Sequence, residues 1–113
     1  MRRIIPATVS LAIIAATTLL YPHWLNAQAP ATITQKGIAF APSSATISVG
    51  EQIVFRNLDP FGHNVYSPSE GGAFDIGLQP PASETAVTFR DPGKYTIMCR
   101  IHPKMRATVT VKP

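Results

Sequence analysis

The C-terminal part of the chain contains three side chains that can bind a metal ion, spaced three residues apart in the segment CRIHPKM. Cys99 offers a thiolate, His102 an imidazole and Met105 a thioether. Thiolate and thioether are soft ligands that suit copper, and imidazole suits copper as well. These three residues share little as packing residues, so their spacing indicates a site for a transition metal.

Few other soft donors are present beyond the first 27 residues. They are one further histidine, His63, and one further methionine, Met98. Met98 adjoins Cys99 on a predicted strand, so the two side chains point to opposite faces and Met98 is interpreted as a packing residue. His63 begins an earlier predicted strand and must come from a neighbouring strand. The candidate metal ligands are therefore His63, Cys99, His102 and Met105.

Several kinds of site use some of these residue types. Two histidines and one cysteine with a weak methionine ligand are typical of a blue-copper electron-transfer centre. Structural zinc requires four good ligands, and a catalytic zinc held by Cys99 and two histidines would leave Met105 without a purpose. Haem attachment requires a second cysteine, and His102 lies too close along the loop to serve as the base of a cysteine protease. The remaining alternative is a small buried cysteine with core histidines and no metal.

The N-terminus has the pattern of a secretory signal. Two arginines precede a mostly apolar run at 4–20, and small residues lie near Ala27. We expect residues 1–27 to be a cleaved signal peptide, which leaves residues 28–113 as one domain in the periplasm. The rival interpretation is an uncleaved anchor, although the apolar run is at the lower limit of length for a membrane span.

Charge and cysteine content limit the functions of the remaining domain. Without the two N-terminal arginines the net charge is near +2, which is too small to indicate nucleic-acid binding. The segment from Arg90 to Pro113 has six basic residues and one acidic residue, so it is either a solvated face or a docking surface for an acidic partner. A single cysteine excludes an internal disulfide, and a lone thiol in an oxidising compartment is a liability unless it is occupied.

Beyond residue 27 the apolar residues recur with a period of two, which is typical of strands with one buried face. Gly, Pro and Asp residues between these runs mark turns. Residues 68–83 could hold a short turn, and no strand is expected within them. This pattern predicts an all-β, antiparallel-rich sandwich of about seven or eight strands. The expected strands are 32–40 (interrupted by Gly37), 45–50, 52–58, 63–67, 84–89, 94–99 and 105–113.

From about Ile38 to Val111 the sequence resembles the cupredoxins, the small blue copper proteins. The first half matches in FAPSSATISVGEQIVFRNLDPFGHNVYS, and the second half in the pattern F-x-x-P-G-K-Y-x-x-x-C-x-x-H-P-x-M. Two residues between His102 and Met105 match the short ligand loop of amicyanin. The resemblance implies a cupredoxin-like Greek-key β-sandwich.

The resemblance also implies roles for single residues. His63, Cys99, His102 and Met105 would be the ligands of one copper ion, with Met105 as the weak axial ligand. The amide of Asn64 would hydrogen-bond across to the cysteine loop.

The function implied is that of a periplasmic, monomeric carrier of single electrons between redox partners, by Cu(II)/Cu(I) cycling and without enzyme activity. The alternatives are a periplasmic copper carrier or copper-resistance protein, and a metal-free sandwich used for protein contacts. The sequence departs from the family where Arg100, Lys104 and Arg106 flank the loop histidine, a place where cupredoxins usually have apolar surface. The identity of the partner therefore does not follow from the resemblance.

Overall fold

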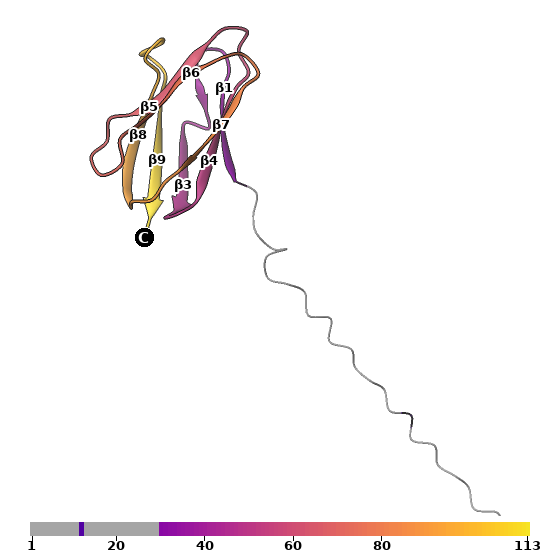
Figure 1. Ribbon diagram of the computed structural model, residues 1–113, viewed down its shortest axis with the longest axis vertical. Coiled ribbons are helices and arrows are strands. Elements are labelled where there is room, and N and C mark those ends of the chain that lie inside the picture. Colours follow the sequence, from indigo (N-terminus) through magenta and orange to yellow (C-terminus); the bar gives the residue numbers. More distant parts are fainter. Residues whose placement is uncertain (1–11, 13–29) are drawn as a thin grey trace, which may run out of the picture.

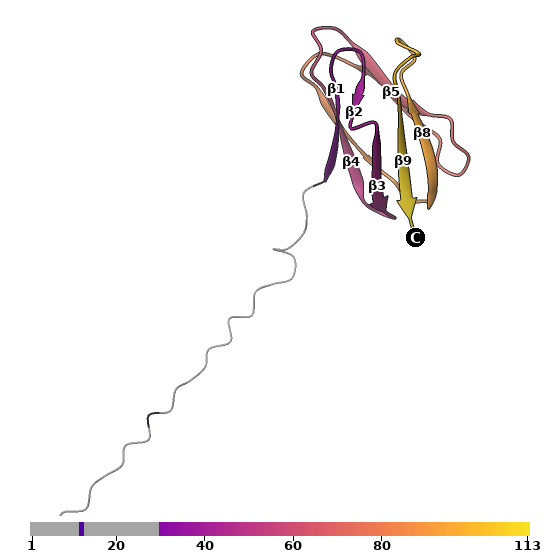
Figure 2. The ribbon, with the colours of Figure 1, turned by 180° about the vertical axis from the view of Figure 1, so that it is seen from behind.

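The computed structural model describes Ala12 and residues 30–113, so the predicted signal at 1–27 lies almost entirely outside the described residues. The described part forms a sandwich of nine β-strands (Figures 1 and 2). The strands are β1 (Ala31–Gln35), β2 (Phe40–Ala41), β3 (Ser44–Ser48), β4 (Gln52–Asn57), β5 (His63–Ser67), β6 (Phe74–Gln79), β7 (Glu84–Thr88), β8 (Gly93–Met98) and β9 (Arg106–Lys112). Among these described residues we find no helix of the length and apolarity that a membrane crossing requires.

The strands form two mixed sheets. One has the order β2-β1-β4-β7, and the other has the order β3-β9-β8-β5-β6. Strands β1 and β4 pair in parallel, as do β3 and β9, and the remaining pairs are antiparallel. The predicted all-β sandwich is thus confirmed, and most strand bounds agree with the sequence pattern to within one or two residues.

Two elements differ from the expectation. The strand expected over 32–40, with an interruption at Gly37, is two strands in a tight hairpin, because Gly37 and Ile38 both adopt left-handed backbone angles (φ 61° and 55°) and turn the chain between β1 and β2. No strand was expected within 68–83, yet this segment contains the edge strand β6. Its period of two is obscured because Gly77 interrupts it with a φ of 74° and Leu78 remains 71% exposed.

The core lies between the sheets and consists of the apolar residues that alternate along the strands. On β8 and just after it Tyr95, Ile97 and Cys99 are buried, and on β9 Ala107, Val109 and Val111 are buried. The two inward faces predicted from the sequence are therefore confirmed. Because these faces belong to paired neighbouring strands, packing fixes the connection that joins β8 to β9.

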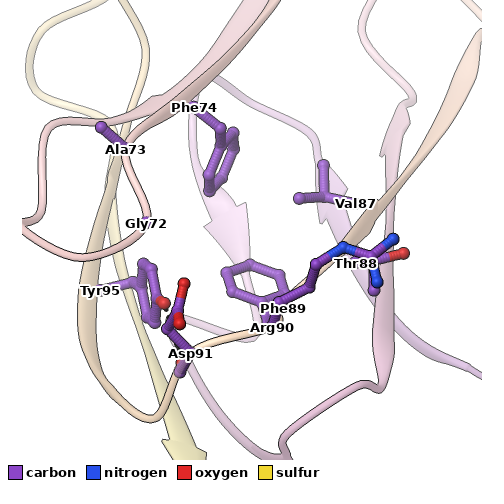
Figure 3. A pocket seen from close by; sticks show the side chains of 9 residues that line it. All are labelled: Gly72, Ala73, Phe74, Val87, Thr88, Phe89, Arg90, Asp91 and Tyr95. Atoms are coloured by element: carbon purple, nitrogen blue, oxygen red, sulfur yellow. Dashed lines mark hydrogen bonds between the residues drawn. The ribbon is translucent and has the colours of Figure 1, made fainter.

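Aromatic side chains fill the half of the sandwich around the start of β8. Phe74, Phe89 and Tyr95 border a hollow of about 200 Å³ and pack edge to face, with Phe89 between the other two (Figure 3). The Tyr95 hydroxyl donates a hydrogen bond to the carbonyl oxygen of Asp91 at 2.8 Å, four residues upstream. Tyrosines bonded in this way fasten corners in β-sandwiches. These contacts hold the start of β8, and Cys99 follows the opposite end of the strand.

Strands β5 and β8 carry the first histidine and the cysteine, and they share only one registered pair, Tyr66 with Met98. By contrast, β8 and β9 are paired along six positions, up to Met98 opposite Arg106. The connection from β8 to β9 projects from the end of the sandwich that lies away from the C-terminus (Figure 1). The fully paired β8–β9 hairpin thus presents its connecting loop beside β5, a strand that pairs with β8 at one registered position.

Candidate metal centre

Three of the four candidate ligands meet at that end of the sandwich. The ligand atoms of His63, Cys99 and His102 all lie within 4.8 Å of one another. His63 is the first residue of β5, Cys99 directly follows β8, and His102 lies in the connection to β9. Cys99 and His63 are buried and His102 is half-buried. The long-range approach of His63 to the cysteine loop, inferred from the sequence, is therefore confirmed.

Met105 lies at the end of the same loop, immediately before β9. Its side chain is 1% exposed, and its backbone N–H donates to the His102 carbonyl oxygen at 2.9 Å. That hydrogen bond closes a turn between the two residues. The thioether is thus drawn into the interior at the same end of the molecule as the other three side chains.

The two histidine rings approach each other with their Nδ1 atoms. Nδ1 of His63 lies 3.2 Å from Nδ1 of His102. Two imidazole nitrogens bound to one ion at about 2.0–2.1 Å, with an angle of about 100–120° between them, would be roughly 3.1–3.6 Å apart. Together with the neighbouring thiolate, this separation fits the donor set of a single copper ion.

The orientation of His63 is fixed from behind by Asp59. Nε2 of His63 lies 2.7 Å from Oδ2 of Asp59. Since a carboxylate only accepts, Nε2 carries the proton, and the lone pair of a neutral ring is then at Nδ1. Carboxylates that hold a histidine in this way set its tautomer and increase its strength as a ligand.

Asp59 is itself held by the β1–β2 hairpin. Its Oδ1 accepts a hydrogen bond from the Gly37 amide at 2.7 Å, and its Oδ2 accepts one from the Ile38 amide at 3.0 Å. Burial by itself raises the pKa of Asp59, but the hydrogen bonds from His63 and the two amides outweigh burial and keep the pKa below its ordinary value of 3.8. Asp59 was expected only to mark a turn, and its one sequence signal for a role at the site is its position four residues before His63.

The Cys99 sulfur receives a hydrogen bond from the neighbouring strand. The backbone N–H of Asn64 donates to Sγ at 3.4 Å. The Asn64 side chain also joins the two segments, since its Oδ1 accepts from the Arg100 amide at 3.2 Å. The bond from Asn64 to the cysteine loop, which the resemblance implied, is confirmed.

Arg100 has a different place from the one expected. The sequence put it among the cations that flank the loop histidine, but its Nε donates to Oδ2 of Asp75 at 2.8 Å and its guanidinium lies 4.0 Å from the centre of the Tyr66 ring. Arg100, the Gly77 amide and Asn64 together lower the pKa of Asp75 from 3.8 to about 2. Arg100 is therefore tied to the sandwich by an ion pair, although its side chain is still 60% exposed. Lys104 and Arg106 are exposed as well.

The surface beside His102 is more apolar than the sequence suggested. The Phe61 ring is 40% exposed, and its centroid lies 5.3 Å from that of His63 and 5.6 Å from that of His102. Ile101 in the ligand loop is 48% exposed. Phe61 was not predicted as part of this surface, because it belongs to the turn before β5 and lies far from the ligand loop in sequence.

Known proteins with related sequences and folds bind copper. Residues 27–112 match the family model described as copper binding proteins, plastocyanin/azurin family. Plastocyanin of Rumex obtusifolius is 34% identical over 76 residues, which are 58% of this chain and 77% of that protein. Chloroplastic plastocyanin of Fritillaria agrestis is 32% identical over 76 residues, and there the match spans 46% of the relative.

Solved structures agree with the fold. A copper-containing nitrite reductase from Thermus scotoductus superposes with a TM-score of 0.70 and 27% identity, over 75% of this chain and 23% of the reductase chain. An amicyanin variant in the Cu(I) state superposes with a TM-score of 0.69 over 76% of this chain and 85% of its own, at 20% identity. The chain belongs to the copper-binding plastocyanin/azurin family, and its fold is that of a cupredoxin.

Proposed function

We propose that this protein is a blue copper protein that carries single electrons, and that His63, Cys99, His102 and Met105 hold its copper ion. The observation that carries the proposal is the convergence of one thiolate and two imidazoles within 4.8 Å, with the two Nδ1 atoms 3.2 Å apart. This donor set, with the thioether of Met105 at the end of the same loop, is the one that blue copper centres use.

The chain's own contribution is to hold these donors still. A bound copper ion supplies a centre whose charge changes by one. Asp59 fixes the ring of His63, the Asn64 amide bonds the Cys99 sulfur, and packed strands hold both ends of the ligand loop. Donors that cannot move keep the same arrangement before and after an electron is transferred, so little energy is spent on rearrangement.

His102 is the ligand through which electrons would enter and leave. It is half-buried, whereas the other three proposed ligands are buried. The exposed ring of Phe61 lies beside His102, and the exposed side chain of Ile101 belongs to the residue directly before it. This apolar surface would allow a partner protein to approach the imidazole edge closely.

We further propose that residues 1–27 direct export and are removed, and that residues 28–113 act as a monomer in the periplasm. The support is the N-terminal pattern of two arginines and an apolar run. Four protein donors leave no open position for a substrate, which argues for a carrier and against an enzyme. The likeness to a nitrite reductase is compatible with this, since the chain spans 23% of that protein.

The decisive experiment is the visible and paramagnetic resonance spectrum of the copper-loaded domain, followed by titration with a one-electron reductant. We expect an intense visible thiolate-to-copper band that disappears and returns with one electron per copper. A colourless copper-loaded protein would overturn the proposal. Rapid loss of copper to a chelator, without reversible cycling, would instead assign the protein to copper delivery or resistance.

The proposed partner is a redox protein with an acidic docking surface, because Lys104 and Arg106 are exposed in and next to the ligand loop. Oxidation of the reduced protein by an anionic metal complex such as hexacyanoferrate(III) should slow about tenfold as salt rises from low to high. Oxidation by a cationic cobalt complex should accelerate. Stopped-flow rates measure both.

A pair of lysines serves as a matched control for this charge effect. Lys104→Gln should weaken the salt dependence, whereas Lys112→Gln should not, because Lys112 ends β9 at the far end of the sandwich (Figure 1). Equal effects of the two changes, or rates that ignore ionic strength, would contradict a basic docking surface at the ligand loop.

A further inference from the structure

Asn64 is bound on two sides, and only one of them is the cysteine loop. Its Nδ2 donates to Oδ1 of Asp75 at 2.8 Å and to the Gly77 carbonyl oxygen at 2.9 Å. Both acceptors belong to β6, the edge strand that the sequence pattern did not reveal. The residue that hydrogen-bonds the Cys99 sulfur is therefore oriented from the edge of the sheet.

Asp75 connects that edge strand back to the cysteine. Its Oδ2 accepts from Nε of Arg100, the residue directly after Cys99, and its Oδ1 accepts from the Gly77 amide at 2.8 Å. The contacts therefore form a closed ring that leaves Cys99 through Arg100, passes through Asp75 and Asn64, and returns to the Cys99 sulfur. The guanidinium of Arg100 is also stacked on Tyr66.

We propose that Asp75 and Arg100 are positioning residues of the metal centre, whose ion pair closes this ring and keeps the Asn64 N–H directed at the Cys99 sulfur. Neither side chain is placed against a proposed ligand atom, so both act through Asn64 and through the backbone next to Cys99. Hydrogen bonding around the cysteine sulfur tunes blue copper centres. In this respect the inference rests on the proposed function, but the ring itself is a property of the copper-free chain.

The exposure of this ion pair does not by itself distinguish it from an ordinary surface pair. The side chains of Arg100 and Asp75 are 60% and 39% exposed, and exposed pairs usually contribute little to stability. A second pair of similar exposure, Arg56 with Glu84 at 3.3 Å, lies in the other sheet. The difference is that the Asp75 carboxylate also accepts hydrogen bonds from Asn64 and Gly77. Removal of this carboxylate would therefore free the Asn64 side chain and disturb the hydrogen bond from Asn64 to the Cys99 sulfur.

The first test uses copper-free protein and amide hydrogen exchange measured by NMR. Asp75→Ala and Arg100→Gln should each accelerate exchange of the Asn64 and Arg100 amides by about tenfold or more, because these amides open locally. Exchange at Val109, in the centre of β9, should not change. Arg56→Gln is the matched control and should leave the Asn64 amide as it is in the unaltered protein.

The second test compares visible spectra and reduction potentials of the copper-loaded variants. Asp75→Ala removes a negative charge and Arg100→Gln removes a positive one, so charge alone would shift the potential in opposite directions. If both side chains position the Asn64 amide, the thiolate-to-copper bands should shift in the same direction in both variants. The shift should be absent in Arg56→Gln.

Two results would overturn the proposal: exchange at Asn64 that is no faster in Asp75→Ala than in Arg56→Gln, or band shifts of opposite sign in Asp75→Ala and Arg100→Gln. Failure of the proposed function looks different. In that case the unaltered protein would be colourless with copper, while the exchange experiment would still report on the ring.

Discussion

Cys99→Ser is expected to remove the intense visible absorption of the copper-loaded protein completely. The colour of a blue copper centre arises from charge transfer between the cysteine sulfur and the metal, and a hydroxyl provides no such transition in the visible range. The substitution is nearly isosteric, and the Asn64 amide that now donates to the sulfur can donate to the new hydroxyl. The fold should therefore persist, and the visible spectrum together with bound copper per chain measures the result.

Met98→Leu is the matched control for this change. Met98 is the last residue of β8, adjoins Cys99, and is registered with Tyr66 on the neighbouring strand. A leucine there retains the packing volume and should leave the colour intact. If colour survived in Cys99→Ser, or was lost equally in Met98→Leu, the assignment of Cys99 as the thiolate ligand would be wrong.

Asp59→Ala should produce the second large effect, on both copper affinity and stability. The substitution leaves the His63 ring and the amides of Gly37 and Ile38 without their acceptor. Loss of a partner behind a ligating histidine typically weakens metal binding about 10–100-fold. Buried donors without a partner cost about 1–3 kcal/mol each, and Ile38 would also lose support for its left-handed backbone.

Chemical unfolding of the copper-free variant separates the two parts of this prediction. We expect the free energy of unfolding to fall by at least about 2 kcal/mol. Water can take the place of the carboxylate at the more exposed of the three donors, but not at the buried His63 ring. Glu70→Ala removes an exposed carboxylate and should change neither quantity. Copper affinity in Asp59→Ala that matches this control would show that the carboxylate does not hold the His63 ring.

The alternation of apolar residues and the spacing of the metal-binding residues were enough to predict most of the strands and the ligand loop. The alternation of Tyr95, Ile97 and Cys99 placed the cysteine on the inward face, and the start of β5 at His63 was anticipated to the residue. The spacing of Cys99, His102 and Met105 fixed three candidate ligands because they share one loop. His63 could be added because few other donors were available.

The residues that sequence analysis missed act through contacts between distant segments. Asp59 is tied to the turn at Gly37 and Ile38, and Asp75 is tied to Arg100. A single sequence contains no spacing rule for such pairs. Arg100 was misplaced for the same reason, because its position beside the loop histidine in sequence says nothing about the direction of its side chain.

The single registered pair between β5 and β8 has a consequence for the copper-free chain. Before metal is bound, this seam is closed near the ligands mainly by side chains, so it is the place where the copper-free sandwich would part first. An ion that His63 and Cys99 bind together would fasten both sides of the seam at once and favour the closed form by mass action. Metal scarcity would then leave the strand edges accessible to proteolysis and aggregation.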